Sequence, residues 1–379
     1  MNNSNFEFTV GRKIKNIESY GFAYSQIKEI HLPKHGETIK QSTFASCCSL
    51  QKVTLPKTIK ILESYAFEDC SDLREVKNLN NVMVFNSSIF ADCDSFVVRI
   101  SFNNGKLFKE NAFSSTNLPQ KIEVKDCTFE KGALSSCRCL KTVIFTDEFK
   151  EDFIINNLFY NAKNLYQIVL NNKIRIIKQN AFKYTTLKKI NLEEVEVIEA
   201  YAFSETKLTE ISLPKVKSLG SSAFEKNFHL KRASFFGNKT LEEFPTYLFF
   251  SCDLESIIFP ENLKVIGLKA LFNCCFKEVR LPSTIEKLKE SFIGNNEKLE
   301  YLEIPASVKF FEENCLGDLG ARTKKGTKLV LLGTPKIEKT NVFYLNHQFF
   351  RLPEIHCLFK NRNNFAWDMI FLQQCFDFL

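Results

Sequence analysis

A phenylalanine, usually preceded by a small residue, recurs along almost the whole chain at intervals of 20 to 27 residues. Two leucines fill gaps in the series, so that fifteen positions share one frame. These positions are Phe22, Phe44, Phe67, Phe90, Phe113, Leu134, Phe159, Phe182, Phe203, Phe224, Phe249, Phe272, Phe292, Leu316 and Phe343. Such a period predicts a solenoid, because one unit of about 23 residues cannot bury its own apolar face and must stack on its neighbours.

Each repeat has the same internal order, which the segment LQKVTLPKTIKILESYAFEDC shows well. Leu50, Val53 and Leu55 alternate with polar residues like one face of a strand, and Pro56 ends that strand because it cannot donate to a ladder. A second apolar pair follows, and Phe67 then stands on what we expect to be a short helical turn. The loop after the phenylalanine varies in length, whereas the strand frame stays constant.

Stacked repeats should bring equivalent phenylalanines into one column inside the coil. Strands of adjacent coils in a parallel sheet lie about 4.8 Å apart, which is a suitable spacing for stacked rings. We therefore expect Phe44, Phe67, Phe90 and Phe113 to form a continuous interior column.

The chain has thirteen cysteines, and six of them stand three residues after a position of the phenylalanine series. These six are Cys47, Cys70, Cys93, Cys137, Cys252 and Cys275. Other repeats place Ser, Thr or Ala there, which is typical of a small packed position and predicts buried, reduced thiols. Disulfides and metal sites are the alternatives, but no pair of Cys-x-x-Cys motifs is present, so we predict neither a metal nor a cofactor.

The combination of L-x-x-[VI]-x-[LI]-P, a second apolar pair, a small-Phe pair and then Cys closely resembles the BspA-type leucine-rich repeats. The resemblance covers residues 6–345 and implies one right-handed solenoid of about 14 to 15 coils. It also implies a parallel β-sheet on the concave face, with short turns or helical turns and minor strands on the convex side. Known members of that family are largely surface or secreted proteins implicated in adhesion.

The concave sheet is the usual contact face of a solenoid, so its outward-facing residues are the candidate binding residues. We select Arg99, Lys121, Ile144, Val169, Lys189, Glu210 and Arg232. One interpretation is a mixed polar platform for a protein partner, with Ile144 and Val169 as a small apolar spot. The other is that neighbouring opposite charges simply steady the sheet by a few tenths of a kcal/mol each.

Charge and motifs exclude several other functions. The net charge of +7 arises from 51 basic and 44 acidic residues, and we find no basic block that indicates nucleic-acid or anionic-membrane binding. Nucleophile, metalloprotease and phosphate-loop motifs are all missing, so we predict no enzymatic activity. We expect a protein-protein interaction scaffold, with a surface adhesin exported without a classical signal peptide as the alternative.

The two ends of the chain carry the remaining expectations. The N-terminus has no signal-peptide pattern and no stretch is apolar enough to span a membrane, which favours a cytoplasmic location, with the cell surface as the alternative. Residues 346–379 depart from the repeat, and we expect them to cap the solenoid with a helix over 364–376. Peripheral membrane contact through this segment is the less favoured interpretation.

Overall fold

The chain folds as a parallel-strand β-solenoid of about 13 turns with almost no helix. The computed structural model describes residues 7–9, 17–312, 314–317, 319, 327–333 and 336–337. These residues belong to two compact units, Met1–Asn191 and Leu192–Leu379, and each is described by itself. The sequence predicts 14 to 15 coils, but the repeat around Phe343 lies outside the described residues.

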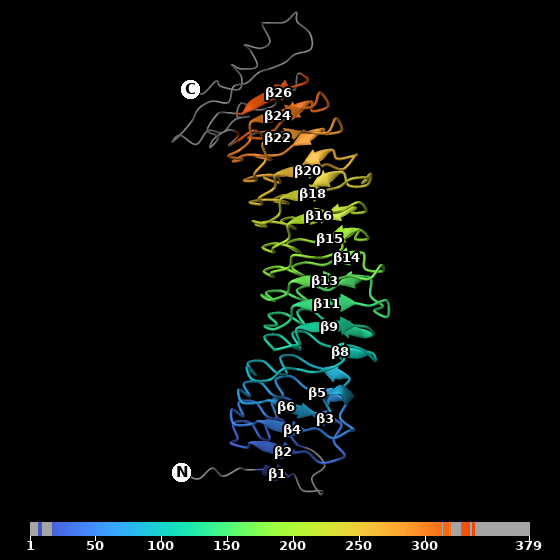
Figure 1. Ribbon diagram of the computed structural model, residues 1–379, viewed down its shortest axis with the longest axis vertical. Helices are drawn as coiled ribbons and strands as arrows, with labels where there is room; N and C mark the ends of the chain where they lie inside the picture. Colours follow the sequence, from blue (N-terminus) through green and yellow to red (C-terminus); the bar gives the residue numbers. More distant parts are fainter. Residues whose placement is uncertain are drawn as a thin grey trace, which may run out of the picture. The chain divides into compact units, whose positions relative to one another are not determined.

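In each unit a coil contributes one strand to a first row and a shorter strand to a second row (Figure 1). The first row of Met1–Asn191 consists of β1 (Glu7–Thr9), β2 (Glu29–His31), β4 (Lys52–Thr54), β6 (Glu75–Lys77), β9 (Lys121–Val124), β11 (Thr142–Phe145) and β13 (Gln167–Val169). Its second row consists of β3 (Thr38–Ile39), β5 (Ile61–Leu62), β7 (Val84–Phe85), β8 (Lys106–Phe108), β10 (Cys127–Phe129), β12 (Phe153–Ile154) and β14 (Ile176–Ile177). A 3-10 helix, η1 (Leu79–Asn81), is the single helix among the described residues.

The unit Leu192–Leu379 repeats this arrangement. Its first row consists of β16 (Glu210–Ser212), β18 (Arg232–Ser234), β20 (Ser256–Ile258), β22 (Glu278–Arg280), β24 (Tyr301–Ile304) and β26 (Lys328–Leu331). Its second row consists of β15 (Val197–Ile198), β17 (Ser218–Leu219), β19 (Glu243–Phe244), β21 (Val265–Ile266), β23 (Lys287–Leu288), β25 (Phe310–Phe311) and β27 (Lys336–Ile337).

Every strand pair within the two rows is parallel, as the sequence period predicts. In β2 and β4, for example, Glu29 lies opposite Lys52 and Ile30 lies opposite Val53, exactly one repeat later in the chain. Alternation along the strand turns Ile30 and Val53 inward, where both are fully buried, while the flanking residues face out. The strand frame read from the sequence is therefore confirmed.

The segment around each phenylalanine is a turn and not the helical turn expected from the sequence. In the coil of Phe44, Ser42 and Ser46 both have left-handed backbone conformations, with φ of 50° and 56°. The N–H of Phe44 then donates to the carbonyl oxygen of Ala66 in the next coil at 2.9 Å, while the N–H of Cys47 donates back to Phe44 at 3.2 Å. Because alternate N–H groups are used for inter-coil bonding, a continuous helical ladder cannot form.

The left-handed pairs also define which residue points into the coil, and they correct the sequence frame at two places. Lys269 and Asn273 are left-handed and bracket Leu271, so that Leu271 occupies the interior position that we assigned to Phe272. In the same way Ser291 and Asn295 bracket Ile293 instead of Phe292. Both errors have one cause. Two adjacent apolar residues could each occupy the interior position, and the phenylalanines of the other repeats favoured choosing the phenylalanine.

The predicted phenylalanine column is present. Phe22, Phe44, Phe67 and Phe90 are stacked with ring centroids 5.5, 5.1 and 5.4 Å apart, and the next ring, Phe113, follows at 6.2 Å. The second unit has its own stack of Phe203, Phe224 and Phe249, at 5.3 and 5.5 Å. Offset ring stacking adds to the burial of each ring, so the column is the main apolar core of both units.

The expected C-terminal cap is not among the described residues. Residues 346–379, including the predicted helix over 364–376, lie outside them. The division into one solenoid over 6–345 and a capping segment therefore stays a prediction.

Candidate functional site

Four of the predicted binding residues lie together on the outward face of the β9, β11 and β13 sheet. Ile144 of β11 lies directly opposite Val169 of β13 and, on its other side, opposite Glu123 of β9. Lys121 begins β9 in the same sheet, and Lys189 is bridged to the first residue of β13. The sequence therefore identified neighbours in space that are about one repeat apart in the chain.

The apolar pair at the centre of this face is partly exposed. Ile144 and Val169 are half-buried, and their strand neighbours Val143 and Ile168 point inward and are buried. Lys121 and Lys189 are exposed. We call Lys121, Ile144, Val169 and Lys189 the first-unit face. Its arrangement is a small apolar spot with lysines near it and with Glu123, which lies 3.8 Å from the Lys121 ammonium group, directly beside Ile144.

Arg99 does not join this face. It is exposed, but it lies outside the strands, in the coil where the first row is interrupted between β6 and β9. In this coil Val98 is fully buried directly before Arg99, so the inward frame is shifted relative to the other repeats. The strand frame read from the sequence therefore does not hold in this coil, although Arg99 itself is exposed as expected.

Glu210 and Arg232 lie on the outward face of the second unit and bind each other. They are opposite one another in β16 and β18, and the Arg232 guanidinium donates to one Glu210 carboxylate oxygen at 2.6 Å through Nη2 and at 3.2 Å through Nε. Both side chains are well exposed. For these two residues the structure favours the interpretation that opposite charges steady the sheet.

Two residues beside the first-unit face, Tyr166 and Lys188, were not predicted from the sequence. Tyr166 directly precedes β13 and is 39% exposed, and the ammonium groups of Lys188 and Lys189 both lie 5.9 Å from the centre of its ring. This distance is within the range of a cation–π interaction. The signal was present in the sequence, because a tyrosine followed one repeat later by two lysines predicts this contact once the coil frame is known.

The cysteines of the series are interior hydrogen-bond donors. The Sγ atoms of Cys70 and Cys93 donate to the carbonyl oxygens of Phe44 and Phe67 in the preceding coils, at 3.1 and 2.9 Å. Where Asn227 takes this position, its Nδ2 atom donates to the carbonyl oxygen of Phe203 at 2.8 Å. The position therefore takes a side chain that can donate in these coils, whereas Ala162 fills it without a donor in the coil of Phe159.

All six positions of the cysteine series are buried once the frame is corrected. The correction at Leu271 applies here too, because Cys274 and not Cys275 follows Leu271 by three residues. Cys274 is buried and Cys275 is only half-buried. Burial raises the pKa of the Cys137 thiol to about 12. A thiol that stays protonated at neutral pH is a poor nucleophile and a poor metal ligand. The eleven cysteines of the described part of the chain are free thiols.

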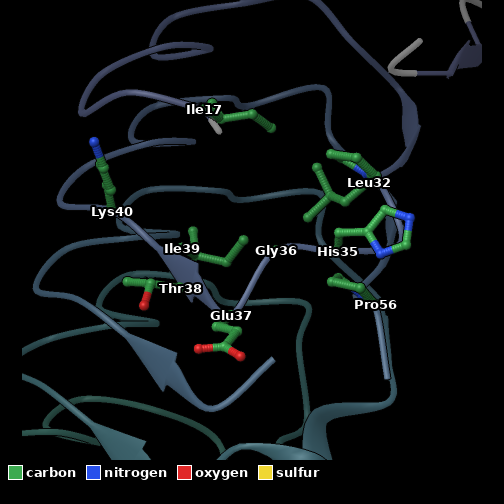
Figure 2. Close-up of a pocket in the computed structure, with 10 residues that line it drawn as sticks. Ile17, Leu32, His35, Gly36, Glu37, Thr38, Ile39, Lys40 and Pro56 are labelled. Atoms are coloured by element: carbon green, nitrogen blue, oxygen red, sulfur yellow. The ribbon is translucent and has the colours of Figure 1, made fainter. Parts of the chain in front are cut away.

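A cavity lies at the N-terminal coils of the first unit. Its volume is about 390 Å³ and it is lined mainly by residues 32–40, with His35, Glu37 and Lys40 as its titratable groups. In Figure 2 the His35 and Lys40 side chains lie at opposite ends of this cavity, and Lys40 forms an ion pair with Glu18. Its polar groups therefore do not converge on one point, as catalysis requires.

Two other kinds of site are absent from the described residues. No group of three or more His, Cys, Asp or Glu side chains is placed to hold a metal ion within that part of the chain. Among the same residues, no helix has the length and apolar character that crossing a bilayer would need.

The fold and the outward strand rows define a solenoid repeat protein of the leucine-rich-repeat class. The family model described as BspA type leucine rich repeat region matches six copies over residues 1–119, 104–231 and 242–320. The chain therefore belongs to the BspA-type leucine-rich repeat family, and the resemblance read from the sequence is confirmed.

Solved structures of leucine-rich repeat proteins are similar to this chain. A leucine-rich repeat protein from Bacteroides ovatus is 20% identical, with a TM-score of 0.62 over 83% of this chain and 91% of that chain. A leucine rich cell surface protein from Faecalibacterium prausnitzii is 16% identical, with a TM-score of 0.36 over 86% and 88%. The first of these supports the fold. No curated protein matches the chain.

Proposed function

We propose that this protein is a non-enzymatic scaffold that binds a protein partner through the first-unit face. The observation that carries the proposal is the direct pairing of Ile144 with Val169 on the outward side of β11 and β13, with Lys121 in the same sheet and Lys189 bridged to its edge. A partly exposed apolar centre with a charged surround is typical of protein-binding patches, in which the centre supplies affinity and the rim supplies specificity.

The absence of enzymatic activity is part of the same proposal. Three features support it: the buried Cys137 thiol stays protonated, the polar groups of the cavity around residues 32–40 diverge, and the fold class is used mainly for interaction. The outward row of the second unit is a weaker candidate, because Glu210 and Arg232 already satisfy each other's charge.

The test replaces the apolar pair with small polar residues. Full-length protein, the double variant Ile144→Ser with Val169→Ser, and the matched control Ile258→Ser are each used to capture partners, which are quantified by mass spectrometry. Ile258 is a suitable control because it also faces outward, from β20, and is 51% exposed. We expect a captured protein to be reduced about tenfold or more by the double variant, as loss of a central contact implies.

The Ile258→Ser control shows whether loss of capture is specific to the first-unit face. Retention by Ile258→Ser together with loss in the double variant supports the first-unit face. Equal capture by all three proteins, each with an unchanged melting temperature, would place binding elsewhere on the molecule and overturn the proposal.

A further inference from the structure

The net positive charge of this chain arises from one segment, residues 153–192. Residues 153–192 contain seven lysines and arginines and no aspartate or glutamate. The whole chain has 51 basic and 44 acidic residues, so the residues outside this segment carry 44 of each and have no net charge. The excess charge of this segment comes from missing acids and not from a dense run of lysines, so it does not form a basic block.

The structure gathers part of this charge around two tyrosine rings. The ring of Tyr184 has the ammonium groups of Lys163 and Lys183 at 5.1 and 5.0 Å from its centre, and the Tyr160 ring stands edge-on to it at 5.6 Å. Tyr166 has Lys188 and Lys189 beside it, as described above. The rings hold several ammonium groups in place without neutralising them, since a cation–π contact leaves the full positive charge.

The two rings belong to one continuous surface. The loop of one coil runs beside the loop of the next: the Asn161 N–H donates to the carbonyl oxygen of Lys183 at 2.8 Å, and the Lys188 N–H donates to that of Tyr166 at 2.9 Å. Between them the Thr186 hydroxyl donates to the carbonyl oxygen of Lys163 at 2.9 Å. We call Lys163, Tyr166, Tyr184, Lys188 and Lys189 the lysine–tyrosine cluster.

Three lysines of the cluster have no acidic partner among the residues that the structure describes. These are Lys163, Lys188 and Lys189, and all three are exposed. Other surface lysines are paired with acids: Lys215 and Lys217, for example, each lie 2.6 Å from a glutamate oxygen of the preceding coil. The charges of the cluster are therefore available to a ligand.

We propose that the lysine–tyrosine cluster binds an acidic segment of a protein partner; this rests on the proposed function, because the cluster adjoins the first-unit face at Tyr166 and Lys189. A lysine ammonium offers three donors and no acceptor, so its ligand must supply anionic oxygens. Opposite charges on the two partners speed association and select among partners.

The same geometry argues against a nucleic acid as the ligand. Bases bind single-strand sites by stacking on free aromatic faces, whereas lysines and a second ring already surround the tyrosines here. Two neighbouring coils present a strip only about 10 Å wide. In the sequence the acid-free segment is bounded by Glu151 and Asp152 before it and by Glu193 and Glu194 after it. Such a short cationic stretch suits a few carboxylates better than a long polyanion.

The experiment uses the full chain and a fluorescein-labelled poly-glutamate peptide, with binding followed by fluorescence anisotropy at low and at physiological salt. The test variant is Lys163→Gln with Lys188→Gln and Lys189→Gln, which removes charge but keeps polar side chains. The control variant is Lys57→Gln with Lys60→Gln and Lys207→Gln, three exposed lysines outside the cluster. Both variants lose the same net charge, so a general effect of charge would change them equally.

We expect the test variant to lose about tenfold or more in affinity and the control to change by less than about threefold. Binding should also weaken as salt rises, because the cluster is exposed. Replacing Tyr166 with Leu should weaken binding, whereas Tyr166→Phe should retain it, since phenylalanine keeps the ring face that holds the ammonium groups. Unchanged thermal unfolding of each variant confirms that the fold is intact.

Three results would overturn the inference: no binding of poly-glutamate by the unaltered chain at low salt, equal losses in the test and control variants, or tighter binding of oligothymidylate or phosphatidylserine vesicles than of poly-glutamate. Partner capture that depends on Ile144 and Val169, without any poly-glutamate binding, would remove this inference and leave the proposed function standing. Cluster-dependent peptide binding without that capture supports the cluster and counts against the apolar centre.

Discussion

The interior phenylalanine column and the outward strand rows recur at the same interval, but they differ in how strictly the residue type is kept. From Phe22 to Phe90 the interior repeats one ring type, with each ring stacked on the next. On the outward side, consecutive positions of β9, β11 and β13 are Lys121, Thr142 and Gln167. An interior side chain must pack against the coil before it and the coil after it, and both contacts limit which residue type fits. An outward side chain needs only to be soluble or to suit a partner.

The outward rows differ again between the two units. The second unit pairs Glu210 with Arg232 across neighbouring strands. The first unit has a similar pair, Lys52 with Glu29 at 2.9 Å, but elsewhere it holds the ammonium groups of Lys188 and Lys189 against a tyrosine ring. The same repeat frame thus provides paired opposite charges at one place and, among the described residues, lysines without an acidic partner at another.

The largest expected effect comes from opening the interior column. Phe67 is fully buried and stacked on both sides, at 5.1 and 5.4 Å, so Phe67→Ala should lower the free energy of unfolding by about 3–5 kcal/mol. Phe236→Ala is the matched control, because Phe236 is 77% exposed and should change stability by no more than about 0.5 kcal/mol. Urea titration measures both, and equal small losses would show that the column is not the core.

A smaller effect is expected at the interior donor position. Asn227 is fully buried and its amide donates to the carbonyl oxygens of Phe203 and Phe224, at 2.8 and 2.7 Å. Asn227→Ala should cost about 1–3 kcal/mol, because two buried acceptors lose their donor.

The natural exchange at this position provides the control. Cys252 donates to the carbonyl oxygen of Phe224 at 3.0 Å, so Asn227→Cys should lose less stability than Asn227→Ala in the same urea titration. If the alanine and cysteine variants are equally stable, volume alone governs the position and the hydrogen bond is unimportant.

Lys106 is a buried residue with a charged side chain, whereas most interior side chains are apolar. Its side chain is 1% exposed, and Nζ has a single long contact with Asn103 Oδ1 at 3.4 Å. Burial lowers the pKa of Lys106 below its ordinary value of 10.5. We expect Lys106→Met to raise the free energy of unfolding at neutral pH by on the order of 1 kcal/mol, since the poorly partnered charge is removed.

The pH dependence of this gain has a definite sign. Between the lowered pKa of Lys106 in the folded state and 10.5 in the unfolded state, the unfolded chain binds more protons, so the stability of the unaltered protein rises with pH. The advantage of Lys106→Met should therefore be full at neutral pH and shrink as pH approaches 10.5. A constant or growing advantage in urea titrations at several pH values would contradict the charged-lysine explanation.

The smallest effect is expected on the outward row of the second unit. Glu210 and Arg232 are 62% and 65% exposed, and an ion pair so well solvated should contribute no more than about 0.5 kcal/mol. Glu210→Gln should thus shift the melting temperature only slightly, and less at high salt, where the pair is already screened. A loss as large as that of Asn227→Ala would mean that this row is structural and not simply a tolerant surface.

Much of this protein follows from its sequence, because a repeated pattern reports the same constraint many times. The period alone predicted parallel strands, the stacked column through Phe44 and Phe67, and the burial of Cys47, Cys70 and Cys93. The outward positions of Lys121 and Val169 followed from simple alternation along a strand.

Other features were decided by the tertiary structure. Leu271 and Phe272 are both apolar, and only the left-handed residues on either side show that Leu271 faces inward. The turn is not helical because its N–H groups bond to the next coil, which a single repeat does not contain. The lysine–tyrosine cluster likewise depends on neighbouring coils: the ammonium groups near Tyr166 come from residues more than twenty positions later in the chain, and only stacking brings them to its ring.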